Sequence, residues 1–153
     1  GFSDAADLAV ILNEIIAIGG TTAHLMPVSE AIITEWMNHD PDASNWVLAE
    51  LDGAVIGFQF AEPHSQLPAD AADVASFVKP GITGQGIGRA LFSATCDACR
   101  NLGYKWINAT IRADNQSGLT YYSAMGFKDW HNDPTATLSD GRVTGKISKR
   151  FDL

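Results

Sequence analysis

The chain has 153 residues, a formal net charge of −8, and contents of 46% hydrophobic and 18% charged residues, which excludes a disordered protein and suits one globular domain. The excess of acidic residues disfavours nucleic acid, which is bound through clustered Lys and Arg. No stretch approaches the roughly 20 apolar residues that span a bilayer, and the amino end has no signal-peptide pattern, so we expect a soluble cytoplasmic protein without a membrane partner.

The first part of the chain predicts two helices. Apolar residues recur at helical spacing between Leu8 and Ile16, and Gly19-Gly20 ends that helix with the left-handed turn that glycine allows. A second, shorter helix begins after Ser29, whose hydroxyl is suited to cap it. We expect each helix to pack one apolar face inward.

The middle of the chain predicts three strands. The runs 46–51 and 54–60 are separated by Asp52-Gly53, and this pair favours a tight β-hairpin because both central positions of the turn need positive φ. The stretch 62–72 is rich in Pro, Ala and Asp and is predicted to be an exposed loop. A third strand follows at 73–78 and stops before Pro80.

A helix is predicted from about residue 87 to residue 102. Its predicted inward face consists of Ile87, Leu91, Ala94, Ala98 and Leu102. Cys96 and Cys99 have the C-x-x-C spacing of redox and zinc sites, but they fall inside this helix and the chain offers no second cysteine pair. We therefore expect two small apolar side chains there and no metal.

The remaining elements complete a mixed α/β, or α+β, fold built on one sheet. In chain order they are a strand at 106–112, a helix at 115–125, a strand at 127–130 and a strand at 141–151. The chain has no internal repeat and no interdomain linker, which predicts a single domain.

Between the third strand and the following helix lies the turn Thr83-Gly84-Gln85-Gly86-Ile87-Gly88-Arg89. Alternate glycines let the backbone turn tightly, and the helix that begins there presents unpaired amides and the positive end of its dipole. This arrangement predicts an anion site suited to a pyrophosphate, although a glycine-rich connection without a ligand remains an alternative. The turn lacks the Lys-Ser/Thr of P-loop NTPases and the G-x-G-x-x-G with a following acid of dinucleotide sites.

This turn, together with Val78-x-Pro80, the strand at 107–111 and the pattern Asn115…Tyr122…Gly126-Phe127, resembles the GNAT superfamily of acyl-CoA N-acyltransferases. The family's turn reads (Q/R)-x-x-G-x-(G/A); Gly86 and Gly88 match it, and Thr83 departs from it. The amino-terminal part is similar to the phosphinothricin and amino-acid N-acetyltransferase subgroup, for example at Thr21-Thr22-Ala23 and Trp36, although the subgroup's Arg-rich stretch is absent.

The resemblance implies one GNAT acetyltransferase domain over residues 1–153. The implied fold is a central twisted sheet of about six or seven strands, flanked by about four helices and splayed between the family's fourth and fifth strands. The family's opening strand is largely missing before Phe2, which favours a truncated or disordered start. A homodimer in which the C-terminal strand pairs across the interface is a further expectation.

The resemblance also implies an enzyme that transfers an acetyl group from acetyl-CoA, its co-substrate, to the primary amine of a small molecule by direct attack in a ternary complex. An amino acid or an amino-acid analogue comes first as the acceptor, before a polyamine or a protein N-terminus. The loops 19–28, 38–45 and 62–72 are expected to form the acceptor pocket. A non-catalytic acyl-CoA sensor and a nucleotide-binding or structural protein are the competing classes.

By the same resemblance, particular residues receive roles. The cofactor-binding set is Phe77, Val78, Thr83, Gly84, Gln85, Gly86, Ile87, Gly88, Arg89 and Asn115. Tyr122 is implied to be the general acid for the coenzyme A thiolate; the alternative is an aromatic side chain packed beside Tyr121 at the core edge. Asp73 is the candidate general base by its position, against a solvated residue at a strand start. Glu62, Glu50 and His64 remain alternative bases.

Overall fold

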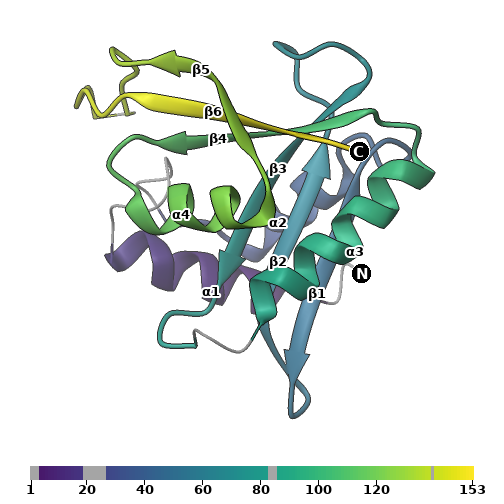
Figure 1. The fold of residues 1–153 in the computed structure, drawn as a ribbon. Helices are drawn as coiled ribbons and strands as arrows, with labels where there is room; N and C mark the ends of the chain where they lie inside the picture. Colours follow the sequence, from purple (N-terminus) through teal and green to yellow (C-terminus); the bar gives the residue numbers. More distant parts are fainter. Residues whose placement is uncertain (1–3, 19–26, 83–85, 139) are drawn as a thin grey trace.

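The computed structural model describes residues 4–18, 27–82, 86–138 and 140–153. In chain order the elements are α1 (Ala5–Ile18), α2 (Glu30–Asn38), β1 (Asn45–Leu51), β2 (Ala54–Glu62), β3 (Ala71–Val78), α3 (Ile87–Asn101), β4 (Trp106–Arg112), α4 (Gln116–Met125), β5 (Lys128–Asp133) and β6 (Lys146–Asp152) (Figure 1). The strands form one mixed sheet in the order β1-β2-β3-β4-β6-β5. The six strands and four helices of the described residues confirm the predicted mixed fold of about six or seven strands and about four helices.

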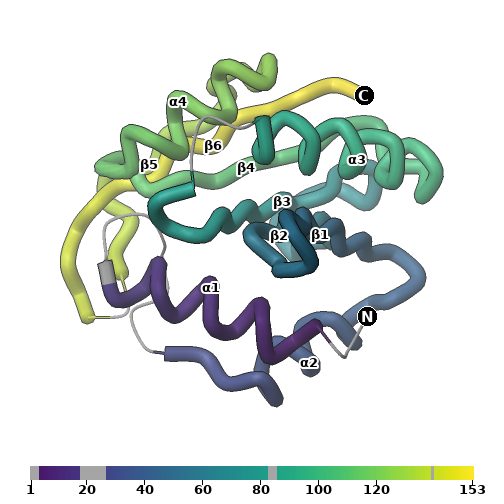
Figure 2. Tube along the Cα trace, turned by 90° about the horizontal axis from the view of Figure 1, so that it is seen from below, coloured from purple at the N-terminus to yellow at the C-terminus, as the bar shows by residue number. Residues whose placement is uncertain are grey.

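Helices cover both faces of the sheet. In Figure 2, α1 and α2 lie below the sheet and α3 and α4 lie above it. One apolar core, with Leu8, Ile33 and Phe58 fully buried, fills the space on the α1/α2 side. The other contains Phe92 and Phe127 and fills the α3/α4 side. Each fully buried side chain of this size contributes about 1.5–3 kcal/mol, so both faces stabilise the sheet.

Two local predictions, the hairpin turn and the cap of α2, are confirmed, whereas the predicted Gly19-Gly20 turn lies outside the described residues. Asp52 and Gly53 form the two-residue turn between β1 and β2 with φ values of 51° and 81°, as a tight hairpin requires. The Ser29 hydroxyl accepts a hydrogen bond from the amide of Ile32 at 3.2 Å and so caps α2. These features depend only on neighbouring residues, which is why the sequence alone predicts them.

The predicted inward face of α3 is correct at Leu91 and wrong at Ala94 and Leu102. The residues that α3 buries are Leu91, Phe92, Thr95, Cys96 and Cys99, while Ala94 is exposed and Leu102 is 39% exposed. Phe92 sets this orientation, because its ring packs edge-on against Phe151 at 5.0 Å. Cys96 and Cys99 are both free and buried, which confirms that they pack as small apolar side chains.

The carboxyl-terminal strands also differ from the prediction. The strands predicted at 127–130 and 141–151 are β5 at Lys128–Asp133 and β6 at Lys146–Asp152, joined by a connection that contains a single bridge between Thr137 and Val143. β6 lies between β4 and β5 and pairs with both. Its backbone is therefore used within the sheet, which argues against pairing of β6 across an interface, and the homodimer stays a prediction.

The splay predicted from the family resemblance is present between β3 and β4. These parallel strands pair only at Ala71–Trp106, Ala72–Ile107 and Asp73–Asn108. Beyond Asp73, β3 continues to Val78 paired with β2 alone among the described strands. The strands therefore diverge and leave one side of β3 without a strand neighbour. Within the described part of the chain, no helix has the length and apolar character needed to cross a membrane.

Candidate active site

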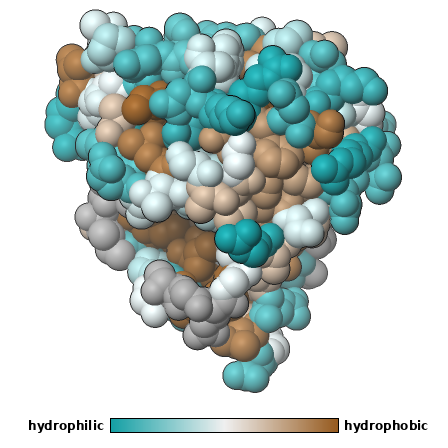
Figure 3. All heavy atoms as spheres, in the orientation of Figure 1, coloured by the Kyte–Doolittle hydropathy of each residue, from teal (hydrophilic) through white to brown (hydrophobic). Residues whose placement is uncertain are grey.

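A cavity of about 480 Å³ opens where β3 and β4 diverge, between the end of β3, the start of α3 and α4. Seven of the ten residues predicted to bind the cofactor line it: Phe77, Val78, Gly86, Ile87, Gly88, Arg89 and Asn115. The other three, Thr83, Gly84 and Gln85, lie outside the described residues. Figure 3 shows hydrophobic surface gathered in a recess on this side of the molecule. The structure thus brings together residues from three separate elements.

One end of the cavity is formed by the first turn of α3. Gly86 precedes this helix in the left-handed conformation, with φ 71° and no side-chain hydrogen bond that caps the helix. The first amides of a helix have no partner inside the helix, and the helix dipole places partial positive charge there. Arg89 lines the cavity in the same turn. This end is suited to a phosphate group.

Asn115 also lines the cavity and has a structural role as the N-cap of α4. Its Oδ1 accepts hydrogen bonds from the amide of Gly118 and from the hydroxyl of Ser117, both at 3.0 Å. The side chain is buried and lines the cavity. The N-cap explains why an asparagine begins this helix, whatever it contacts in the cavity.

Tyr122 is buried behind the cavity wall. Its side chain is 6% exposed and packs against Phe127 at 5.1 Å and against Tyr121 at 4.9 Å, which is the packing that the alternative, structural interpretation of Tyr122 expects. Burial raises the pKa of the Tyr122 phenol well above its ordinary value of 10, so it stays protonated at neutral pH. Ser76 and Tyr121 line the cavity, and Tyr122 does not.

The hydroxyl of Tyr122 lies 2.8 Å from Oγ of Ser76 on β3. Ser76 also accepts a hydrogen bond at 2.7 Å from Nε2 of Gln59 on β2. Gln59 is completely buried, and the same nitrogen donates to the Tyr121 hydroxyl at 3.1 Å. A polar group buried in a core needs such partners, so these four side chains form one network behind the cavity.

Asp73 lies on the other face of β3. Alternate residues of a strand point to opposite faces: Phe77 joins the core beneath α1 and α2, whereas Val74 joins the core beneath α3 and α4. Asp73 therefore shares the face of Phe77, and Ser76 shares the face of Val74. The candidate base and the candidate acid approach the splay from opposite faces of the sheet.

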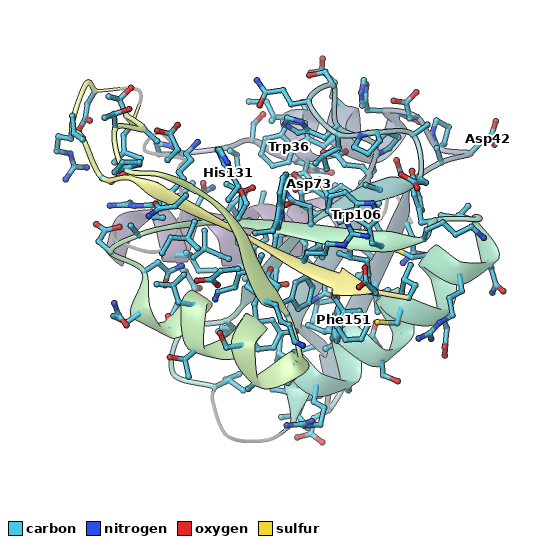
Figure 4. All side chains as sticks on the ribbon, turned by 45° about the horizontal axis from the view of Figure 1, so that its top comes forward. Trp36, Asp42, Asp73, Trp106, His131 and Phe151 are labelled. Carbon is cyan, nitrogen blue, oxygen red and sulfur yellow. The ribbon has the colours of Figure 1, made fainter. Side chains whose placement is uncertain are left out.

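The carboxylate of Asp73 is held by Asn108, the residue opposite it in the parallel pairing, whose Nδ2 donates to Oδ1 at 2.9 Å. Asn108 is itself fixed, because it also donates to Thr110 at 3.0 Å and accepts from Nε1 of Trp130 at 2.9 Å. Burial raises the pKa of Asp73 despite the hydrogen bond from Asn108, which lowers it. Figure 4 shows Asp73 at the end of the sheet where Trp106 also lies.

The alternative bases are distributed unevenly. Glu62 is the direct cross-strand neighbour of Asp73, and burial together with the charge of Asp73 raises its pKa. His64 is exposed in the adjoining loop, where its Nδ1 accepts from the amide of Gln66 at 3.1 Å. Glu50 is exposed on the edge strand β1. Glu62 is therefore the alternative base paired directly with Asp73, and His64 lies near enough for its charge to lower the pKa of Asp73.

The predicted acceptor loops can be placed in part. The loops 38–45 and 62–72 precede β1 and connect β2 to β3, so both border the end of the sheet where Asp73 lies. The amide of Lys105 bonds the carbonyl of Asp70 at 2.7 Å, which fixes the second loop to the start of β4. Of the third loop, residues 19–26 lie outside the described residues.

Four polar residues of the site were not predicted: Gln59, Ser76, Asn108 and Tyr121. Two of them carry a sequence signal, because Gln59 and Ser76 interrupt the otherwise apolar runs of β2 and β3. A polar residue inside a buried strand needs a partner, and this makes it a site candidate. The partners themselves lie 17 to 62 residues away in the chain, so the pattern does not identify them.

Residues 14–127 match the sequence model of the Acetyltransferase (GNAT) family. Among characterised proteins, the chain is 32% identical over 90 residues to the mycothiol acetyltransferase of Sanguibacter keddieii, a match that covers 56% of this chain and 29% of that protein. It is 29% identical over 107 residues to the mycothiol acetyltransferase of Nocardiopsis dassonvillei, covering 66% of this chain and 32% of that protein. The matches thus span about a third of the length of these relatives.

Solved structures show the same fold. A phosphinothricin acetyltransferase from Sinorhizobium meliloti, in complex with acetyl-CoA, superposes with a TM-score of 0.88 at 24% identity, covering 100% of this chain and 85% of that one. A ribosomal-protein-alanine N-acetyltransferase from Brucella melitensis superposes with a TM-score of 0.90 at 20% identity, covering 100% and 96%. The predicted fold is confirmed, and because the family match spans most of the sequence, the chain belongs to the acetyltransferase (GNAT) family.

Proposed function

We propose that the chain transfers an acetyl group from acetyl-CoA to the primary amine of a small molecule, by direct attack within a ternary complex. The observation that carries this proposal is the cavity at the splay, which gathers seven of the residues that the family resemblance assigns to the cofactor. When bound, acetyl-CoA supplies a thioester whose carbonyl carbon an amine can attack. The family membership of the chain supports the same reaction type.

The residues around the cavity fit this ligand. Beyond Asp73, the free side of β3 offers backbone groups to an extended chain such as pantetheine, as an added strand would use them. The α3 start offers amides and Arg89 to the pyrophosphate. Apolar residues such as Ile82 and Met125 complete the lining. The acetyl-CoA complex of the phosphinothricin acetyltransferase, which has the same fold, agrees with this assignment.

For the acceptor, we propose that Asp73 takes the proton from the attacking amine, directly or through water. A carboxylate whose pKa is raised by burial is a better base near neutral pH than an exposed one. Glu62 beside it adds negative charge, and this favours a cationic amine at this end of the sheet. An amino acid or an amino-acid analogue is the first acceptor, in keeping with the structural likeness to a phosphinothricin acetyltransferase.

For the leaving group, we propose Tyr122 as the acid that serves the departing thiolate. Its raised pKa keeps the donor protonated over the whole physiological range. An ordinary thiol has a pKa of about 8.5, so the departing thiolate is stabilised best by a donor that stays protonated. Tyr122 bonds Ser76, and Ser76 lines the cavity whereas Tyr122 does not, so Ser76 must take part in this role.

The test is release of coenzyme A from acetyl-CoA across a panel of amino acids, phosphinothricin, polyamines and peptides with a free N-terminus. We expect an amino acid or an analogue to give the highest kcat/KM. Acetyl-CoA should raise the melting temperature, whereas ATP and NAD should not. Gly86→Val should abolish that shift, because valine does not tolerate the positive φ at this position.

The outcomes separate the competing classes. Stabilisation by acetyl-CoA without coenzyme A release with any amine would identify a sensor domain. Stabilisation by ATP or NAD alone would identify a nucleotide-binding protein. A preference for peptides or polyamines would keep the acetyltransferase and change its acceptor.

A further inference from the structure

Tyr122 and the cavity are separated by one side chain. The tyrosine hydroxyl does not reach the cavity wall, and its hydrogen-bond partner among the described residues is Oγ of Ser76 at 2.8 Å. Ser76 itself lines the cavity. Any hydrogen-bond donation from Tyr122 toward a ligand in the cavity therefore passes through the Ser76 hydroxyl.

The hydrogen bond between Tyr121 and the carbonyl of Gly88 fixes the direction of the other hydrogen bonds around Ser76. The carbonyl oxygen of Gly88 only accepts, so the Tyr121 hydroxyl, at 2.7 Å, must donate to it. A phenol has one proton, so Tyr121 accepts from Gln59 in turn. This places the amide nitrogen of Gln59, and not its oxygen, toward Tyr121 and Ser76. Gln59 therefore donates to Ser76 at 2.7 Å.

The same reasoning applies to Tyr122. Its proton is buried, and among the described residues Ser76 is the only group within hydrogen-bond distance. An unsatisfied buried donor costs about 1–3 kcal/mol, so Tyr122 donates to Ser76. Ser76 Oγ then accepts two hydrogen bonds, one from Gln59 and one from Tyr122, which occupies both of its lone pairs. Its own proton is left to donate, either to the Tyr121 hydroxyl, with which Ser76 also has a hydrogen-bond interaction, or to a ligand in the cavity that Ser76 lines.

We propose that Ser76 donates the hydrogen bond that stabilises the departing coenzyme A thiolate, and that Tyr122 and Gln59 are positioning residues that direct its hydroxyl into the cavity. This inference rests on the proposed acetyltransfer and replaces the acid role of Tyr122 within it: the tyrosine keeps its proton and acts on the thiolate by hydrogen bonding through Ser76. Successive hydrogen bonds polarise one another, so a serine that accepts two becomes a stronger donor toward a negative sulfur.

Hydrogen bonding is sufficient for this role, and complete proton transfer from Tyr122 is not required. Burial raises the pKa of Tyr122 further above the roughly 8.5 of a free thiol. Moving the proton from the phenol to the sulfur is therefore unfavourable. Hydrogen bonds from Tyr122 to Ser76 and from Ser76 to the sulfur need no such transfer. The thiolate is stabilised in the cavity and takes its proton from water on release.

The sharpest test uses two variants of the same shape. Ser76→Thr keeps the hydroxyl and Ser76→Val replaces it with a methyl group, so any difference between them reports the hydroxyl alone. We expect Ser76→Val to have a kcat on the order of tenfold to a hundredfold below that of Ser76→Thr, with KM for acetyl-CoA within about twofold, because the unreacted thioester is uncharged.

A binding measurement supplies a readout that does not depend on turnover. At about pH 9, where most of a free thiol of pKa about 8.5 is ionised, coenzyme A is compared with an analogue that lacks the sulfur. Wild type and Ser76→Thr should prefer coenzyme A over this analogue by on the order of tenfold, and Ser76→Val should lose the preference. Tyr122→Phe should reduce it, because the serine then loses one of the bonds that direct it.

The outcomes are distinct. If wild type binds neither ligand, the proposed function fails and this inference fails with it. If wild type binds and turns over while Ser76→Thr and Ser76→Val behave alike, only the role of Ser76 is overturned. Circular dichroism and melting temperature check that each variant folds. If Ser76→Thr does not fold, Ser76→Ala and Tyr122→Phe are compared with wild type, and unchanged ligand preference and kcat in both would overturn the inference.

Discussion

The hydroxyl of Tyr121 donates a hydrogen bond to the carbonyl of Gly88 at 2.7 Å, and the ring of Tyr121 occupies the space that a larger residue 88 would need. A Cβ added at residue 88 would lie 2.6 Å from Cε1 of that ring, closer than real Cβ contacts. The sequence pattern explains this glycine by the approach of a phosphate. The structure adds a second reason, which is the tyrosine that forms the cavity wall.

Gly88→Ala should therefore destabilise the protein. Alanine is favoured over glycine inside a helix by about 1 kcal/mol, but forcing a methyl group into occupied space costs about 1–3 kcal/mol. We expect a net loss in the free energy of unfolding, measured by urea denaturation. In a Tyr121→Ala background the same change should become stabilising, because the ring is absent. Stabilisation by Gly88→Ala in both backgrounds would contradict the steric explanation.

Asn115→Ala should lower the free energy of unfolding by about 1 kcal/mol, because the amide of Gly118 loses the side-chain acceptor that caps α4. Asn115→Asp keeps a capping oxygen and should restore most of that stability. If Asn115 also contacts the cofactor, both variants should raise KM for acetyl-CoA. A raised KM in Asn115→Ala alone would limit the residue to its structural role.

Asp73→Asn should increase stability and abolish most activity. The pKa of Asp73 is raised above 3.8 in the folded state, so the folded protein binds the carboxyl proton more tightly than the unfolded chain. The stabilisation that this gives is complete below pH 3.8 and is lost as the pH rises through the folded-state pKa. The amide that replaces the carboxylate does not ionise, so the variant does not lose this stability as the pH rises. Its oxygen can still accept the hydrogen bond from Asn108. We expect its advantage in chemical denaturation to grow between about pH 4 and neutral pH.

In the same variant, kcat should fall by about two to four orders of magnitude, the usual contribution of a general base. Glu62→Gln is the matched control: it removes the neighbouring carboxylate, so it should stabilise in the same direction and reduce kcat much less. Equal loss of kcat in both variants would mean that the two carboxylates act together. Full activity in Asp73→Asn would exclude Asp73 as the base.

The buried thiols predict a loss of stability in alkali. Burial raises the pKa of Cys99 from 9.0 to about 12, so between these values the unfolded chain releases a proton that the folded protein retains. Stability should fall as pH rises through this window, and Cys99→Ala should make the decline shallower. At neutral pH, iodoacetamide should label neither cysteine in the native protein and both in urea. Rapid native labelling would show that α3 exposes its buried face.

The features that the sequence predicted and those that only the structure shows differ in how far apart the interacting residues lie along the chain. The Asp52-Gly53 hairpin, the Ser29 cap and the helix that follows the glycine turn involve residues close together in the chain, and all were predicted. The motif from Val78 to Phe127 also identified the family, because its spacing reflects the order of elements around one cavity. Local chemistry and spacing were sufficient for these conclusions.

Tertiary packing decided the rest. The orientation of α3 depends on where Phe92 meets Phe151, 59 residues further along the chain, and no helical period predicts that contact. The hydrogen bond from Asn108 to Asp73 exists only because β3 and β4 pair in parallel with these two residues opposite each other. The placement of Ser76 between Tyr122 and the cavity depends on β3 meeting α4. By itself the sequence predicted the glycine turn and the family motif, because both depend on spacing along the chain, whereas the packing of distant elements decided which residues line the cavity and added Gln59, Ser76 and Asn108.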